Sequence, residues 1–311
     1  MLFFGYICAK TEAGLRFFCL RVFGLAFLLA ASAAPTFAKS ETLPVKLDDY
    51  GRITVPIVLD GRTSTQHFLF DTAARRSLVL NRDSDAKGIR RYEKGTIRHF
   101  SAEGLLRLPA ATISSWKVGG RTVQNSIIGF YADSAELAGL VGNNVFLGRI
   151  LHWQPGSGRL NVYANTAALA DASWHNIGGR PNRHFSVLLT TEYRGVEITV
   201  LVATGASRTM LDGDTLHKLF PNSEVWSPNN VDYKPVEFGL GSQRKNFRAF
   251  KLPDFNIGAW DLGEIEVLSA NFDTQEITGF MNAPVMILGA DILLSREVAF
   301  DFRDYQLWVK D

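Results

Sequence analysis

Short runs of alternating apolar and polar residues dominate the chain from residue 50 onward. Residues 52–59 (RITVPIVL) alternate and end at the turn signal Asp60-Gly61, and the apolar runs 66–71 (QHFLFD) and 77–80 (SLVL) follow. Runs of this length, rich in Val, Ile and Phe and bounded by Gly and Asp, are typical of β-strands. Residues 112–130 add two β-rich runs around a Gly-Gly pair, which predicts a hairpin.

Helical periodicity is scarce in the same region. Two short segments are candidates, residues 134–140 (SAELAGL) and residues 212–220 (DGDTLHKLF). Asp212 and Asp214 are expected to begin the second of these helices, as its cap and its first-turn acid. The pattern as a whole predicts an all-β protein.

The order of the predicted elements occurs twice. Three blocks of the first half are matched, in the same order, by three blocks of the second half: residues 52–80 by 184–211, 112–130 by 255–272, and 139–163 by 286–310. Three matches in one order indicate an internal duplication. The polar, Gly- and Pro-bearing residues 165–183 then predict a connection between an N-terminal lobe, residues 39–164, and a C-terminal lobe, residues 184–311.

The N-terminus has the layout of a secretory signal peptide over residues 1–38. Arg16 and Arg21 precede the apolar run 22–34, and small residues follow up to Ala38. The apolar run is shorter than the ~20 residues of a membrane-spanning helix. We therefore expect a periplasmic or secreted protein that begins close to residue 39 and has no stable membrane insertion after cleavage; an uncleaved signal anchor is the alternative.

Composition limits the chemistry of the exported chain. Cys8 and Cys19 both lie in the predicted signal peptide, so neither disulfides nor cysteine-bound metals are expected. The same segment holds three of the 33 basic and one of the 31 acidic residues, which leaves 30 of each. A neutral chain argues against nucleic acid as a partner. The six histidines show no metal-binding spacing, so we expect no metal and no cofactor.

Two four-residue loops stand at matching places in the duplicated pattern. Residues 71–74 (DTAA) follow the apolar residues FLF, and residues 203–206 (ATGA) follow VLV. Each is paired with a distant apolar-apolar-Gly block, residues 140–142 and 287–289. With these motifs the chain resembles the aspartic peptidases, specifically the retropepsin-like and pepsin-like group, over residues 50–163 and 184–311.

The resemblance implies a bilobal aspartic-peptidase-like fold, with two retropepsin-like β-barrel lobes around a central cleft. It makes Asp71 the catalytic acid, and it places Asp71 and Ala203 opposite each other at the base of the cleft. The remaining loop residues would support the site, with the hydroxyl groups bonding across a pseudo-twofold axis: Thr72, Ala73, Thr204 and Gly205. Flap hairpins would cover the cleft at residues 94–104 and 237–247.

One departure from the family affects the chemistry directly. The family's reaction needs two carboxylates that share one proton, and Ala203 stands where the second carboxylate would be. Asp133 is an alternative source of an acid, whereas the position of Asp291 is structural in the family. Replacing Ala203 by Asp is expected to create a coupled pair with Asp71.

Three functions therefore remain open. The first is an exported aspartic-type endopeptidase in which Asp71 acts with an unrecognised acid or with the Asp71 of a second chain. The second is a catalytically inactive pseudo-peptidase that binds extended peptides in its cleft. The third is a structural scaffold. The expected partner in the first two is a peptide or protein.

Overall fold

The computed structural model describes residues 41–59, 63–80, 83, 88–101, 104–119, 121–131, 137–221, 233–237 and 244–311. The chain divides into two compact units, and the second, residues 38–311, contains all of the described residues. The predicted signal peptide and both cysteines lie outside the described part. No helix within that part is long and apolar enough to cross a membrane.

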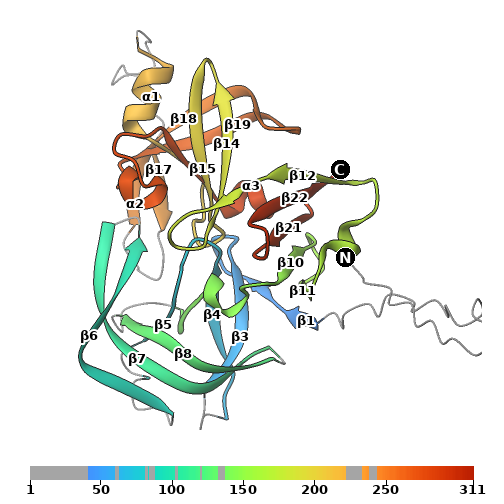
Figure 1. Cartoon of the computed structure of the whole chain (residues 1–311). Helices are drawn as coiled ribbons and strands as arrows, with labels where there is room; N and C mark the ends of the chain where they lie inside the picture. The colour runs from blue at the N-terminus through green and yellow to red at the C-terminus, as the bar shows by residue number, and fades with distance from the viewer. Residues whose placement is uncertain are drawn as a thin grey trace, which may run out of the picture. The chain divides into compact units, whose positions relative to one another are not determined.

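Strands make up most of the described structure, which confirms the predicted all-β class (Figure 1). Two sheets have eight strands each. The N-terminal sheet contains, from edge to edge, β2 (Lys46–Leu47), β3 (Ile53–Leu59), β4 (Gln66–Asp71), β9 (Gly139–Gly142), β5 (Ser77–Leu80), β8 (Arg121–Tyr131), β7 (Gly104–Val118) and β6 (Ile89–Ser101). The C-terminal sheet contains β13 (Arg180–Pro181), β14 (Val187–Tyr193), β15 (Val196–Val202), β20 (Val285–Leu288), β16 (Met210–Asp212), β19 (Trp260–Ala270), β18 (Arg244–Ile257) and β17 (Tyr233–Glu237).

The two eight-stranded sheets have the same strand order. Each has parallel pairs at matching places, β4 with β9 and β5 with β8 in the N-terminal sheet, and β15 with β20 and β16 with β19 in the C-terminal sheet. The predicted hairpins β7–β8 and β18–β19 are both antiparallel. The matched sequence blocks thus occupy corresponding positions in two sheets of one topology.

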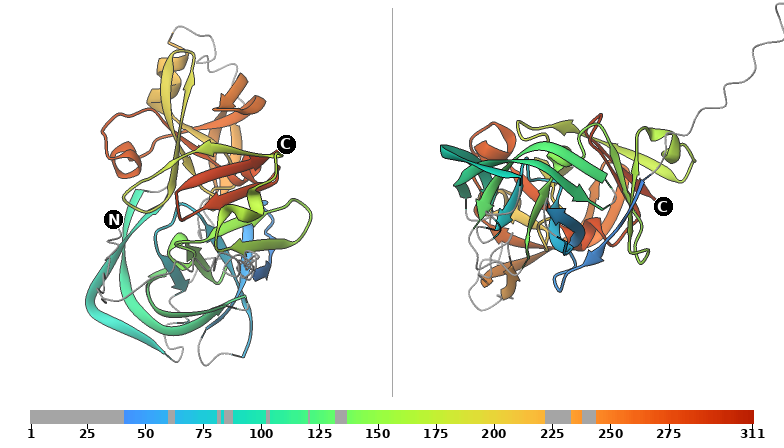
Figure 2. Two further views of the ribbon diagram at one scale, coloured as in Figure 1. Left: turned by 45° about the vertical axis from the view of Figure 1, so that its right-hand side comes forward. Right: turned by 90° about the horizontal axis from the view of Figure 1, so that it is seen from below.

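A third sheet, of six strands, joins the two halves of the chain (Figure 2). Its order from edge to edge is β1 (Glu41–Pro44), β11 (Arg159–Tyr163), β10 (Ile150–Trp153), β21 (Val298–Asp301), β22 (Gln306–Lys310) and β12 (Trp174–Gly178). The central pair β10–β21 is antiparallel, with Leu151 opposite Phe300. Each half contributes strands to this sheet, so the halves are linked by backbone hydrogen bonds as well as by side chains.

The predicted connection, residues 165–183, contains regular structure. The 3₁₀ helix η3 (Thr166–Leu169) begins it, β12 joins the six-stranded sheet, and β13 is an edge strand of the C-terminal sheet. In the six-stranded sheet β12 takes the place that β1 has in the first half. Two short strands, β12 and β13, thus lie within the predicted connection.

Helices are few and short: η2 (Asn143–Val145), α1 (Gly213–Leu219), α2 (Thr274–Thr278) and α3 (Ala290–Leu293). The prediction for α1 is confirmed, since the Asp212 side chain accepts hydrogen bonds from the N–H groups of Asp214 and Thr215. The helix predicted over residues 134–140 is wrong at its C-terminal end. There Gly139 begins strand β9, because burial between two neighbouring strands overrides a weak helical pattern, while residues 132–136 lie outside the described part.

The apolar core is continuous through both halves. One cluster of buried residues includes side chains from the N-terminal sheet, the C-terminal sheet and the six-stranded sheet, among them Phe70, Val202 and Phe300. Burial of this size holds the strands that end at Asp71 and Ala203 in fixed positions. A loop that leaves such a core presents its side chains with little freedom.

Candidate active site

Asp71 is the last residue of β4, directly after three residues that are fully buried, Phe68 to Phe70. It lies opposite Gly142 in the parallel pair β4–β9. In the C-terminal sheet, β15 ends in the same way, and Ala203 continues the pair by donating its N–H to the carbonyl of Leu288 at 3.0 Å. Both loops therefore leave a buried parallel pair at its carboxyl end.

The two loops bind each other through their threonines. Thr72 Oγ1 donates to the carbonyl of Val202 at 2.8 Å and accepts the N–H of Thr204 at 3.0 Å. Thr204 Oγ1 donates to the carbonyl of Phe70 at 2.8 Å and accepts the N–H of Thr72 at 3.1 Å. Both threonines are completely buried. The four bonds form a symmetric pair, and they fix Asp71 and Ala203 on opposite sides of one junction.

Gly205 leaves the space that the Asp71 carboxyl group occupies. A Cβ at Gly205 would overlap with Cγ of Asp71 and would lie 2.8 Å from its Cβ. Neither Gly205 nor Ala73, its counterpart in the first loop, has a positive φ. The glycine is therefore required by close packing against the carboxyl group and not by backbone conformation.

The apolar-apolar-Gly blocks pack directly against the loops. A Cβ at Gly142 would lie 2.6 Å from the carbonyl oxygen of Ala74, and a Cβ at Gly289 would lie 2.6 Å from that of Arg208. Asn143 donates its N–H to Ala74 O at 2.8 Å, and Ala290 donates to the equivalent oxygen in the second loop at 2.7 Å. Each loop is thus supported from below by the same backbone contact.

Two turns reach across the junction, each to the third residue of the opposite loop. In the turn before β3, Asp48 accepts the N–H of Arg52 at 2.8 Å, and the Arg52 guanidinium contacts the carbonyl of Gly205 at 3.4 Å. In the turn before β14, Asn182 accepts the N–H of Ser186 at 3.0 Å. Ser186 Oγ donates to the carbonyl of Ala73 at 2.9 Å. No sequence motif predicts these two contacts, because unlike residues, Arg52 and Ser186, contact the equivalent carbonyls.

The surroundings of Asp71 change the pKa of its carboxyl group. Burial raises its pKa, and hydrogen bonds from the N–H groups of Ala73 and Gly205 lower it, as does the positive charge of Arg52. The Ala73 bond to Oδ1 is 2.8 Å long. The pKa is raised overall, so desolvation outweighs the stabilising contacts. Asp71 can therefore act as a hydrogen-bond donor at higher pH than an exposed aspartate.

Ala203 is part of a buried apolar cluster. It is buried with Leu188 and Leu201, and Ala73 packs against the same cluster. Within the described residues, no second carboxylate forms a hydrogen bond to Asp71; Asp133, the alternative acid, lies outside them.

Two other aspartates named by the sequence analysis lie in structural positions. Asp212 caps α1, and Asp291 accepts hydrogen bonds from both the N–H and the hydroxyl of Thr209, at 3.0 and 2.8 Å. Asn144, at the matching place in the first half, accepts from Ser77 Oγ at 3.3 Å. Burial raises the pKa of both aspartates.

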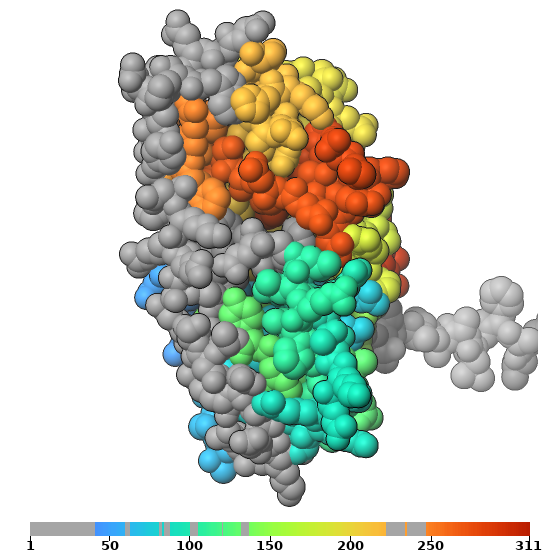
Figure 3. Space-filling model, turned by 90° about the vertical axis from the view of Figure 1, so that its left-hand side faces the viewer, coloured from blue at the N-terminus to red at the C-terminus, as the bar shows by residue number. Residues whose placement is uncertain are grey.

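The two segments expected to be flaps are parts of long hairpins. Residues 94–104 lie at the end of the β6–β7 hairpin, and residues 237–247 lie at the end of the β17–β18 hairpin. Residues 102–103 and 238–243 lie outside the described part. Figure 3 shows that, on one face, the teal β6–β7 hairpin adjoins the orange-red segment that contains α2. Both β6 and β17 are edge strands of their sheets.

The described residues contain no group of three or more histidine, cysteine, aspartate or glutamate side chains that could hold a metal ion. No protein-family model matches the chain, and a search of curated proteins found no match. The functional argument therefore depends on the geometry of the site.

Proposed function

We propose that the described unit is a bilobal aspartic-peptidase-like protein that binds a polypeptide segment in extended conformation beside Asp71. Each eight-stranded sheet would be one retropepsin-like lobe. The support is the common strand order of the two sheets and the exchange of hydrogen bonds between Thr72 and Thr204 at their junction. Residues 1–38 would direct export to the periplasm or the medium.

The observation that carries this proposal is the composition of the junction. Hydrolysis by this type of site requires an acid and a base that share one proton, which one carboxyl group cannot provide alone. Asp71 is held there with a raised pKa, and Ala203 is buried in an apolar cluster. A single protonated carboxyl group donates a hydrogen bond to a peptide carbonyl but leaves no second group to activate water.

The edge strands of the two sheets are a second argument for an extended peptide as the ligand. β6 and β17 each pair on one side only within the described residues. Their free edges present N–H and C=O groups to which a peptide strand can be added, and such addition gives affinity through the main chain.

Hydrolysis remains the second candidate, favoured by one specific observation. The Asp71 loop keeps its whole hydrogen-bond frame, including the donors from Ala73 and Gly205 that hold a carboxylate. An acid supplied by a residue outside the described part, or by a second chain, would complete the pair.

One experiment separates the two candidates. A fluorescently labelled unfolded protein is incubated with the wild type, with Asp71→Asn and with the control Asp304→Asn, from pH 3 to pH 8. Asp304 is exposed on a turn of the six-stranded sheet. We expect binding without fragments for the wild type and the control, and weaker binding for Asp71→Asn. Fragments that depend on Asp71 would establish the second candidate, and absence of binding at every pH would refute the first.

A further inference from the structure

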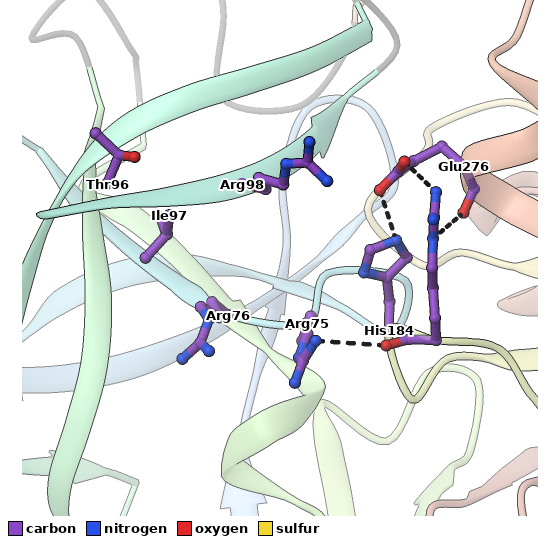
Figure 4. A pocket seen from close by; sticks show the side chains of 8 residues that line it. Arg75, Arg76, Thr96, Ile97, Arg98, His184 and Glu276 are labelled. Carbon is purple, nitrogen blue, oxygen red and sulfur yellow. Dashed lines mark hydrogen bonds and ion pairs between the residues drawn. The ribbon is translucent and has the colours of Figure 1, made fainter.

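A pocket of about 320 Å³ lies beside the Asp71 loop. Four segments line it (Figure 4): Arg75 and Arg76 after the loop, residues 96–98 of β6, and, from the second half of the chain, Arg183 with His184 and separately Glu276. Arg75 follows Asp71 by only four positions in sequence. The pocket therefore adjoins the loop that carries Asp71, the centre of the proposed peptide-binding site.

The wall formed by the second half is bonded to the Asp71 loop. The side-chain amide of Asn143, which is completely buried, donates to the carbonyls of Thr72, His184 and Phe185 at 3.2, 3.3 and 3.0 Å. Arg75 Nη1 lies 3.5 Å from the carbonyl of Arg183, and its guanidinium is stacked 5.1 Å from the centre of the Phe185 ring. The shape of the pocket is thus coupled to the loop that positions Asp71.

Positive charge is in excess in this pocket. Four of the lining residues are arginines and one is a glutamate, which gives a formal charge of +3. The glutamate is already engaged, since the Glu276 carboxylate forms an ion pair with Arg183 and contacts His184 Nε2 at 3.0 Å. Burial lowers the pKa of His184, so this histidine adds no positive charge at neutral pH.

The other three arginines form no ion pair within the described residues. Arg75 has carbonyl and aromatic contacts only, and neither Arg76 nor Arg98 has a carboxylate partner there. Burial lowers the pKa of Arg76, and the neighbouring charge of Arg75 lowers it further. Like charges held together without a counter-charge are unfavourable, and a bound anion would relieve this repulsion.

We propose that this pocket binds a carboxylate of the peptide that occupies the cleft, which makes the protein selective for acidic peptides. This inference rests on the proposed function, because it assigns the peptide's chemistry. Guanidinium groups bind carboxylates through two parallel hydrogen bonds, and this geometry gives both affinity and direction. The volume is sufficient for one acidic side chain or for a C-terminal residue, and both present the same group.

The test compares fluorescent peptides that differ at one position. One set has Glu or Gln inside an extended sequence, and the other has a C-terminal carboxylate or a C-terminal amide. We expect the Glu peptide or the C-terminal acid to bind at least tenfold more tightly than its neutral partner, since hydrogen bonds between charged groups are worth more than tenfold in affinity. Which of the two sets responds identifies the source of the carboxylate.

Variants then locate the effect. Arg76→Gln and Arg98→Gln should each remove about tenfold of the affinity for the acidic peptide and leave the affinity for the neutral peptide unchanged. Arg98 is exposed on β6, so its variant is expected to fold even if Arg76→Gln does not. Arg159→Gln, an exposed arginine on β11, is the matched control and should change neither affinity.

The outcomes distinguish this inference from the proposed function. If peptides bind but acidic and neutral ones bind equally, the inference is overturned and the proposed function stands. If no peptide binds, the proposed function fails, and N-acetylglutamate is then titrated while the Arg Nε–Hε resonances are followed by NMR. Saturable shifts that disappear in Arg76→Gln or Arg98→Gln would support the anion pocket alone, and unchanged resonances would overturn it too.

Discussion

The Asp71 loop and the Ala203 loop have the same backbone contacts but opposite side chains at two positions. The first loop has aspartate followed by Thr-Ala, and the second has alanine followed by Thr-Gly. Because each loop faces the other, these differences are complementary. Gly205 makes room for the Asp71 carboxyl group, and Ala73 packs against the apolar cluster that contains Ala203. The aspartate at residue 71 and the glycine at residue 205 are thus a matched pair.

This complementarity gives the second loop a role that requires no acid at residue 203. The Thr204 hydroxyl forms two of the four hydrogen bonds at the junction, and Gly205 donates to the Asp71 carboxyl group. The second loop therefore acts as a support for the first. Four predictions test this difference in roles.

The largest effect is expected from Thr204→Val. The substitution keeps the shape but leaves the Phe70 carbonyl and the Thr72 N–H without a buried partner, which should cost about 2–4 kcal/mol of unfolding free energy. Thr72→Val should cost a similar amount, because the network is symmetric, and the double variant should cost less than the sum. Urea unfolding measures the free energy of unfolding of all three variants.

Thr190→Val, at an exposed position of β14, is the control, and its free energy of unfolding should stay within about 0.5 kcal/mol of the wild type. A cost for Thr204→Val no larger than that of the control would refute the supporting role.

Gly205→Ala should have the next largest effect, because the added methyl group overlaps with the Asp71 side chain. Overpacking of this kind costs about 1–3 kcal/mol. The reciprocal change Ala73→Gly removes a methyl group without such an overlap and should cost about 1 kcal/mol or less. Thermal and urea unfolding of the two variants would measure the asymmetry directly. Equal costs would show that the carboxyl group does not decide which loop carries the glycine.

Introducing a second acid at residue 203 tests how closely the two loops approach. Ala203→Asp alone is expected to meet the Ala73 methyl group, as Gly205→Ala meets Asp71, so it should be tolerated better by about 1 kcal/mol in an Ala73→Gly background. In the double variant the two carboxyl groups should titrate as a coupled pair, one of them well above the ~3.9 of free aspartate. Carbon-detected NMR titration measures the pair, and cleavage of an unfolded substrate at acidic pH should appear with it. Two independent titrations near 3.9 would show that the loops do not bring the acids together.

The smallest effect is expected from Asp71→Asn, and it is a change in how stability depends on pH. Because burial raises the pKa of Asp71 in the folded protein, its contribution to stability is full below the ordinary value of ~3.9 and is lost as the pH rises through the folded value. Asparagine does not ionise, so Asp71→Asn does not lose stability in this way as the pH rises. The stability of the variant relative to the wild type should therefore increase between about pH 4 and neutral pH, as measured by urea unfolding across that range. Asp212 and Asp291, which also have raised pKa values, are present in both proteins and cancel in the difference. A relative stability that falls with pH would mean that the Asp71 carboxylate is stabilised by the fold.

Sequence patterning was sufficient for the strands that carry a regular alternation, such as β3, and for α1, whose Asp212 cap is a local signal. It was insufficient for residues 139–140, where burial between neighbouring strands decided the conformation. It also failed for β12 and β13, whose composition is typical of a loop and whose strand character depends on pairing partners far along the chain.

The sequence by itself determined the repeated order of the elements and the identity of the two loops, because strand alternation and short loop motifs are local properties. Only the tertiary structure decided what surrounds Asp71. Arg52, Ser186 and Asn143 reach the loops from turns and strand ends that are distant in sequence. The arginines of the pocket likewise come from both halves of the chain. Contacts of this kind depend on how two sheets of one topology meet, and local patterns contain no information about that meeting.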